Sequence, residues 1–280
     1  MTPPSPTDDH RRAGNAFADL LAIMARLRDP QGGCPWDLEQ DFASIAPYTI
    51  EEAYEVADAI DRRAPGDLRD ELGDLLFQVA FHSQMATELG QFSATDVARA
   101  IGDKMLRRHP HVFDRDDGRD ADAQTQAWET MKAEERAARA EVGPLSHLDG
   151  VALALPALMR AEKLQKRAAR AGFDWTDPQD ILAKLREEAG EVQDAVRSEN
   201  AEEIAEEIGD LLFVCANLAR RLRVDPENAL RAANAKFERR FRAMETLAAA
   251  RGQVFAELSL DQQDALWTEV KAAEKSDTPD

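Results

Sequence analysis

Apolar residues recur every three to four positions along most of this chain, which is the period of an amphipathic helix. The first such stretch runs from residue 16 to 28, with Phe17, Leu20, Leu21, Met24 and Leu27 on one stripe. The same pattern predicts helices at about 47–61, 67–89, 93–108, 124–140, 153–171, 201–222 and 227–249. Sustained alternation typical of strands is absent from the sequence, so we expect an all-α fold.

The helical pattern occurs twice along the chain. Residues 71–77 read ELGDLLF and residues 207–213 read EIGDLLF, a shift of 136 (207 − 71 = 136). Residues 128–135, WETMKAEE, likewise match residues 267–274, WTEVKAAE. The sequence therefore predicts two homologous domains, at 15–142 and 151–275, with a disordered lead at 1–14, a linker at 143–150 and a tail at 276–280.

Two pairs of acidic residues flank a predicted turn in the second domain. Glu188 and Glu191 are three residues apart, and so are Glu207 and Asp210, so each pair lies on one face of its helix. Residues 198–200, Ser-Glu-Asn, favour a turn between the two helices. Because both pairs are centred on position 199, an antiparallel hairpin brings the four carboxylates together. Oxygen ligands without His or Cys suit Mg²⁺, or alternatively Mn²⁺.

The alternative interpretation is that these acids are ordinary solvated residues, because 32% of the chain is charged. The first domain argues against it. Glu52, Glu55, Glu71 and Asp74 repeat the same spacing at the same shift of 136 (188 − 52 = 136). Surface acids have no reason to keep register through a duplication that changed most other residues. We therefore predict a second, weaker metal set in the first domain.

The overall charge limits the classes of macromolecule that the chain is expected to bind. With a net charge of −19 and an isoelectric point near 4.7, the chain is not expected to bind nucleic acid or anionic membranes generally, since both need a basic surface. No apolar run approaches the roughly 20 residues of a membrane span, and the first residues lack the apolar core of a signal peptide. We expect a soluble, cytoplasmic protein.

Cationic residues in the second domain complement the acids. Lys236 and Arg240 are four residues apart on one helix face, and Lys163, Lys166 and Arg167 form a second basic face. A carboxylate-held Mg²⁺ beside such cations is what a polyphosphate requires, because its charge must be neutralised at several oxygens. The alternative is a solvated basic stripe. Trp267 is compatible with stacking on a base and equally with a place in the core.

These motifs together resemble the MazG family of two-domain bacterial nucleoside triphosphate pyrophosphohydrolases. The likeness rests on Glu-x-x-Glu followed by Glu-x-x-Asp, on Cys-Pro-Trp-Asp at 34–37 and on KRAARAGFDW at 166–175. The resemblance implies a helical bundle completed by a homodimer. It also implies Mg²⁺-dependent hydrolysis of NTPs or dNTPs between the α- and β-phosphates, to a nucleoside monophosphate and pyrophosphate, in nucleotide-pool housecleaning.

The resemblance also assigns roles to residues of the second domain. It implies that Glu188, Glu191, Glu207 and Asp210 bind the metal and that Lys236 and Arg240 hold phosphate oxygens. Glu187 is the candidate for orienting or deprotonating the attacking water. The expected substrate-binding set is Lys163, Lys166, Arg167, Lys236, Arg240, Trp267 and Lys271.

The first domain departs from this pattern in its first helix. Aligning Trp36 with Trp175 shifts the numbering by 139 and places Met24 at Lys163 and Leu27 at Lys166. We therefore expect catalysis in the second domain. Regulatory nucleotide binding, a scaffolding role and slower activity all stay open for the first. For the whole chain, a nucleotide- or alarmone-binding regulatory protein without turnover, or a purely structural helical protein, are the alternatives to an enzyme.

Overall fold

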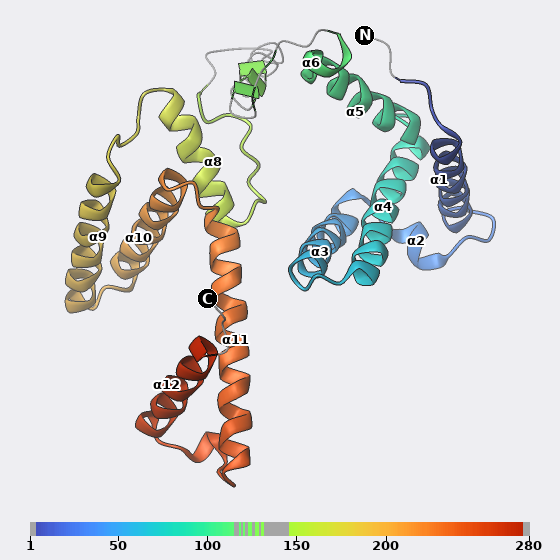
Figure 1. Ribbon diagram of the computed structural model, residues 1–280. Coiled ribbons are helices and arrows are strands. Elements are labelled where there is room, and N and C mark those ends of the chain that lie inside the picture. The colour runs from blue at the N-terminus through green and yellow to red at the C-terminus, as the bar shows by residue number, and fades with distance from the viewer. Residues whose placement is uncertain are drawn as a thin grey trace. The chain divides into compact units, whose positions relative to one another are not determined.

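The computed structural model describes residues 4–114 and 146–276, together with 118, 120, 123, 124, 127, 128, 130 and 131. Within these residues the regular elements are helices, without a strand, which confirms the predicted all-α class (Figure 1). The chain divides into two compact units, residues 1–135 and 136–280. The boundary precedes the expected linker at 143–150 and falls in 132–145, outside the described residues.

The first unit is built on an antiparallel hairpin of α3 and α4, with α1 packed along α4 (Figure 1). Its buried core joins Met24 of α1, Ile45 of α3 and Phe81 of α4. The described helices of this unit are α1 Asp8–Leu27, α2 Pro35–Glu39, α3 Phe42–Asp61, α4 Pro65–Glu88, α5 Ala94–Arg108 and α6 Pro110–Phe113.

The second unit repeats the hairpin with α9 and α10, and α8 packs on α10. α11 follows α10, and α12 folds back on α11 around a small core that includes Met244 and Leu266. The helices are α8 Ala157–Arg170, α9 Pro178–Ser198, α10 Ala201–Arg221, α11 Pro226–Ala250 and α12 Leu260–Ser276, with a short 3₁₀ helix, η1, at Phe255–Glu257.

Both hairpins turn where the acidic spacing predicts. Glu199 ends α9 in the left-handed region with φ of 56°, and Asn200 caps α10 by accepting a hydrogen bond from the backbone N–H of Glu202. In the first unit, Arg63 occupies the equivalent position with φ of 54°. Because the two turns match, the acids of each hairpin are placed at the same level.

Two helices begin earlier than the sequence suggested. α1 begins at Asp8, because Thr7 and His10 form a capping box and Asp8 and Asp9 complement the helix dipole. The disordered lead expected through residue 14 is therefore wrong for residues 8–14. α3 begins at Phe42, because Asp41 and Ser44 form a capping box there. Pro47, where we expected the helix to begin, therefore lies inside it. The helix expected at 124–140 lies largely outside the described residues.

Candidate metal and phosphate site

Three carboxylates converge on the α9–α10 hairpin. Glu188 of α9 and Glu207 and Asp210 of α10 each offer an oxygen, and these oxygens lie within 4.8 Å of one another. Glu188 is only 4% exposed, whereas Asp210 is exposed to solvent. The cluster is thus anchored on one side and open on the other, as a site shared by a metal and an incoming ligand requires.

Glu191 belongs to the same electrostatic group. Partial burial raises the pKa of Glu207, and the negative charges of Glu191 and Asp210 raise it further. The pKa of Glu191 is also raised, mainly by burial and despite the opposing charge of Lys184. Mutual repulsion of this kind is what a divalent cation relieves. The three carboxylates that converge, with no nitrogen or sulfur donor among them, fit a hard ion such as Mg²⁺, and Glu191 lies outside the group whose oxygens are within 4.8 Å of one another.

The structure adds one residue that our sequence analysis missed. Lys184 Nζ lies 2.7 Å from the Glu187 carboxylate and 2.8 Å from that of Glu188. These ion pairs raise the pKa of Lys184 above its usual value. The sequence did contain evidence for this ion pair, because Lys184 precedes Glu188 by four residues and both lie on one helix face. At the equivalent position of the first unit stands Tyr48 (184 − 136 = 48).

The first unit also gathers its predicted acids. Oxygens of Glu52, Glu55 and Glu71 lie within 4.8 Å of one another. Burial, followed by the charge of Asp74, raises the pKa of Glu52. By the shift of 136 these three correspond to Glu188, Glu191 and Glu207, so the two hairpins gather overlapping but different sets of acids, and they also differ in the lysine beside them.

The cations of α8 have separate environments. Lys163 is exposed, and Lys166 Nζ forms a 2.6 Å ion pair with Glu162. Arg167 donates hydrogen bonds to the backbone carbonyls of Leu148 and Gly150, at 3.1 and 3.2 Å. These hydrogen bonds hold the 148–150 segment against α8, which is a structural role for Arg167 that the sequence did not indicate.

The cations of α11 and α12 lie on an arm that begins beyond the α9–α10 hairpin. Figure 1 shows α11 leaving the end of α10 and carrying α12 away from the α9–α10 hairpin. On this arm Lys236 and Lys271 are exposed. Arg240 lies 2.8 Å from Glu274 and 5.5 Å from the centre of the Trp267 ring, which packs against the α11–α12 core.

Burial gives a second possible register between the two first helices, besides the one that aligns the tryptophans. Met24 is the buried residue of α1, and Gln165 is one of two buried in α8, with Ala161. Their offset of 141 (165 − 24 = 141) pairs Leu20 with Ala161 as well. In this register the residues of the first unit that match Lys163 and Lys166 are Ala22 and Ala25, and Arg26 matches Arg167. In this register, as in the one that aligns the tryptophans, the first unit lacks both lysines.

None of the helices in the described parts of the chain is both long and apolar enough to cross a membrane.

Comparison with known proteins gives a family match in both units. The sequence model described as the MazG nucleotide pyrophosphohydrolase domain matches residues 40–113 and 176–244. The two ranges contain both acidic hairpins and Lys236 and Arg240, whereas the α8 cations, Trp267 and Lys271 lie outside them. The double match confirms the predicted duplication.

Similar proteins extend over nearly the whole chain. The nucleoside triphosphate pyrophosphohydrolase of Escherichia coli K12 is 50% identical over 262 residues, covering 93% of this chain and 98% of that protein. The nucleoside triphosphate pyrophosphohydrolase/pyrophosphatase MazG of Thermotoga maritima is 41% identical over 268 residues, covering 95% and 100%. The uncharacterized protein YabN of Bacillus subtilis is 40% identical over 271 residues, which is 96% of this chain and 54% of YabN.

Proposed function

The chain belongs to the MazG family, and from that premise we propose that its second unit hydrolyses nucleoside triphosphates between the α- and β-phosphates. Its relatives at 41 to 50% identity over nearly the full length are named as nucleoside triphosphate pyrophosphohydrolases, so the chain is an enzyme of this class. The substrates are NTPs or dNTPs, and the products are a nucleoside monophosphate and pyrophosphate. Such a reaction removes unwanted nucleotides from a free, cytoplasmic pool.

The single observation that carries the proposal is the convergence of Glu188, Glu207 and Asp210. Together with Glu191 they would hold Mg²⁺, which when bound supplies positive charge to the phosphate oxygens. The pKa values of Glu191 and Glu207 are raised first by burial and then by neighbouring carboxylates, and a bound cation would offset both effects. Mn²⁺ has the same preference for oxygen ligands and is the expected substitute.

Two residues beside the cluster have roles in handling the attacking water. Glu187 is exposed, and its carboxylate is held by Lys184 at 2.7 Å. In the proposed reaction Glu187 accepts a proton as the water oxygen bonds to the α-phosphorus, and the bond from that phosphorus to the bridging oxygen breaks to release pyrophosphate. Lys184 orients Glu187 and counters the negative charge of Glu188.

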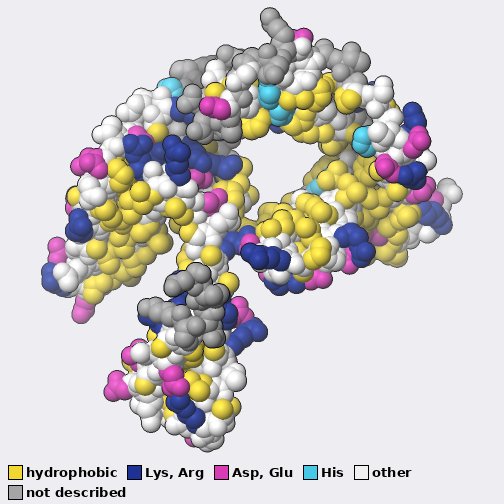
Figure 2. All heavy atoms as spheres, viewed as in Figure 1, with side chains coloured by type: hydrophobic (Ala, Val, Ile, Leu, Met, Phe, Trp, Pro, Cys, Tyr) yellow, Lys and Arg dark blue, Asp and Glu magenta, His cyan; other side chains and the backbone are white. Residues whose placement is uncertain are grey.

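We propose that a second copy of the chain completes the site. Apolar side chains on the hairpin are exposed, among them Val196 at 56%, Ile208 at 43% and Leu212 at 51%. Figure 2 shows the apolar area that covers this hairpin. A homodimer would bury such a surface, and it would let the arm of a partner bring Lys236 and Arg240 to phosphate oxygens that their own chain does not place nearby.

The decisive experiment for the reaction follows the oxygen of water. The enzyme is incubated with dATP or ATP and Mg²⁺ in ¹⁸O-labelled water, and the products are analysed by mass spectrometry. Attack at the α-phosphorus places the label in the monophosphate and leaves pyrophosphate unlabelled. Label in pyrophosphate would move the attack to the β-phosphorus, and release of orthophosphate with a nucleoside diphosphate would reject the proposed reaction.

A further inference from the structure

Arg240, the cation expected to hold phosphate oxygens, is itself held in place by two residues of α12. Its Nε donates a 2.8 Å hydrogen bond to Glu274 Oε2, and its guanidinium lies 5.5 Å from the centre of the Trp267 ring. Trp267 and Glu274 are two helical turns apart, so they lie on the same face of α12. The guanidinium is therefore fixed at one edge by a carboxylate and at one face by an aromatic ring.

Glu274 binds two arginines at once. Arg239 Nε donates to the other carboxylate oxygen, Oε1, at 3.1 Å, and Arg239 Nη2 lies 3.1 Å from the same oxygen. The hydrogen bond from Arg240 lowers the pKa of Glu274, so the carboxylate stays ionised at neutral pH. A carboxylate without this second partner would repel a phosphate. Because Arg239 balances the charge of Glu274, the positive charge of Arg240 remains available to an anionic ligand.

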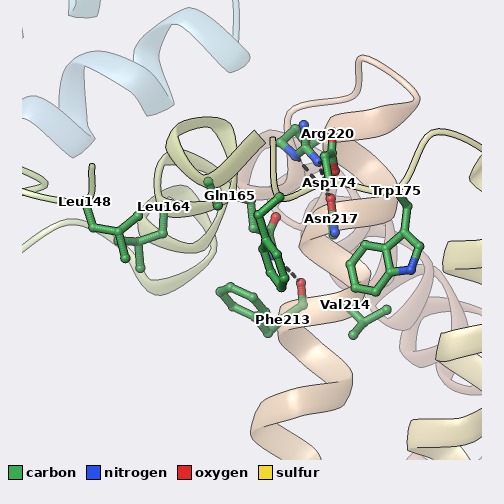
Figure 3. Close-up of a pocket in the computed structure, with 11 residues that line it drawn as sticks. Leu148, Leu164, Gln165, Asp174, Trp175, Phe213, Val214, Asn217 and Arg220 are labelled. Atoms are coloured by element: carbon green, nitrogen blue, oxygen red, sulfur yellow. Dashed lines mark hydrogen bonds and ion pairs between the residues drawn. The ribbon is translucent and has the colours of Figure 1, made fainter. Parts of the chain in front are cut away.

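The other edge of the Arg240 guanidinium keeps its donors. In the described parts of the chain, no residue accepts a hydrogen bond from Nη1 or Nη2 of Arg240. Arg220 of the same unit is the contrast, because its Nε and Nη2 both donate to Asn217 Oδ1 and its Nη2 also pairs with Asp174 (Figure 3). Arg220 thus has a role within the fold, whereas Arg240 keeps the two neighbouring donors that a phosphate group accepts.

The fixed orientation of Arg240 bears on how tightly it can bind a phosphate. A long charged side chain gives up rotamer freedom when it binds a ligand, and an arginine that is already oriented gives up less. The side chain of Arg240 is 18% exposed, whereas that of Arg239 is 63% exposed. Lys236, one turn earlier on α11, is exposed as well. Arg240 is therefore the cation of this group that the packing of α12 orients before a ligand arrives.

The tryptophan meets the arginine in the first unit too. Trp128 matches Trp267 at a shift of 139 (267 − 128 = 139), and Arg108 is the second of two adjacent arginines, like Arg240. Trp128 Nε1 donates a 2.9 Å hydrogen bond to the backbone carbonyl of Arg108. Position 135, which matches Glu274, is again a glutamate and lies outside the described residues. The recurrence of the three residue types indicates that they act together.

We propose that Glu274 is a positioning residue for the reaction, which orients Arg240 on the Trp267 ring so that the two Nη groups meet phosphate oxygens of the substrate. Glu274 does not itself touch the substrate and acts through Arg240. The inference rests on the proposed function, in which the arm of a second copy brings Arg240 to the phosphates. The alternative is that the ion pair only fastens α12 to α11.

The test is a double-mutant cycle on the full chain with a matched control. Glu274→Met removes the acceptor and keeps a side chain of similar length, and it is made alone and together with Arg240→Met. Glu269→Met is the control, because Glu269 of α12 forms a 2.6 Å ion pair with Arg251, the residue after α11. Calorimetry measures the binding of inorganic tripolyphosphate in Mg²⁺, and pyrophosphate release from ATP gives kcat/KM. Thermal unfolding is measured for every variant.

We expect Glu274→Met to weaken tripolyphosphate binding and to lower kcat/KM, each about five- to thirtyfold, and to change neither once Arg240 is replaced by Met. Glu274→Gln, which keeps one acceptor oxygen, should show the same dependence on Arg240 with a smaller loss. Glu269→Met should match the wild type. The inference is overturned if Glu274→Met causes the same loss with and without Arg240, or if Glu269→Met causes an equal loss.

Stability and the reaction are separated from the inference as follows. If Glu274→Met lowers the melting temperature more than Glu269→Met does, Glu274→Gln takes its place in the cycle. Coupling of Glu274 to Arg240 in tripolyphosphate binding, without release of pyrophosphate from ATP, would contradict the proposed function alone. Pyrophosphate release by Glu274→Met with the kcat/KM of the wild type would contradict the inference alone.

Discussion

Lys184 Nζ lies 2.8 Å from the carboxylate of Glu188, the most deeply buried acid of the cluster, which is 4% exposed. Lys184 is thus a cation that α9 itself places beside the acids. Tyr48 stands at the equivalent position of the first unit, so only one of the two hairpins has this counter-charge. We therefore expect the stability of the second hairpin to depend on the binding of metal.

Replacing Lys184 by Met should lower the melting temperature in EDTA, because Glu188 then has no counter-ion in its buried position. Mg²⁺ should restore much of the loss, since the metal supplies the missing positive charge. Differential scanning calorimetry with and without Mg²⁺ measures both effects. Lys163→Met, at an exposed position of α8, is the control. An equal loss in EDTA and in Mg²⁺ would show that Lys184 acts only on packing.

Glu207→Gln should have opposite effects on stability and on metal binding. The pKa of Glu207 is raised by burial and then by neighbouring carboxylates, so removing its charge relieves repulsion in the metal-free protein. We expect a higher melting temperature in EDTA and a smaller stabilisation by Mg²⁺ than in the wild type. Thermal unfolding over a Mg²⁺ titration checks this. A Mg²⁺ response identical to that of the wild type would remove Glu207 from the ligand set.

Lys166→Ala copies Ala25 of the first unit and should weaken substrate binding. We expect KM for ATP to rise about three- to tenfold with kcat nearly unchanged, as for loss of one partly exposed phosphate contact. Steady-state pyrophosphate release gives both constants. A fall in kcat at constant KM would instead assign Lys166 a role in the transition state.

The Arg28–Glu88 ion pair predicts a pH dependence of stability in the first unit. Hydrogen bonds from Arg28, one of them 2.7 Å long, lower the pKa of Glu88. A lowered pKa in the folded state contributes stability above the unfolded value, about 4.3, and the contribution is lost as pH falls through the folded value. The free energy of unfolding of Glu88→Gln should therefore lie below that of the wild type at pH 5 to 8, and the difference should shrink below about pH 4. A difference that is constant down to pH 3 would contradict the assignment.

The hairpins were predictable because their information is local. Helical period, turn residues and acids at constant spacing are all read directly from the chain, and the turns at Arg63 and Glu199 lie at the predicted midpoints. Lys184 could also have been found by its spacing from Glu188. Its ion-pair partners, Glu187 and Glu188, lie three and four residues further along the same helix.

The register of the first helices was not predictable from the tryptophans. Residues 28–41 connect α1 to α3 and contain α2, whereas residues 171–177 connect α8 to α9. Because these connections differ in length, aligning Trp36 with Trp175 shifts the helices before them. Which buried residue of α8 matches the buried Met24 depends on packing, and the tryptophan spacing does not give it. The place of Arg240 and Trp267 on the α11–α12 arm is likewise a tertiary property.

We propose that the acids of the second hairpin, and not those of the first, hold the metal for catalysis. The direct measurement is the rate of pyrophosphate release from ATP and Mg²⁺ by the wild type and two matched double variants, Glu207→Ala/Asp210→Ala and Glu71→Ala/Asp74→Ala. We predict that the second-unit variant loses about 100-fold or more in kcat and that the first-unit variant stays within a few-fold of the wild type. A large loss in the first-unit variant, with the second-unit variant near the wild type, would contradict the claim.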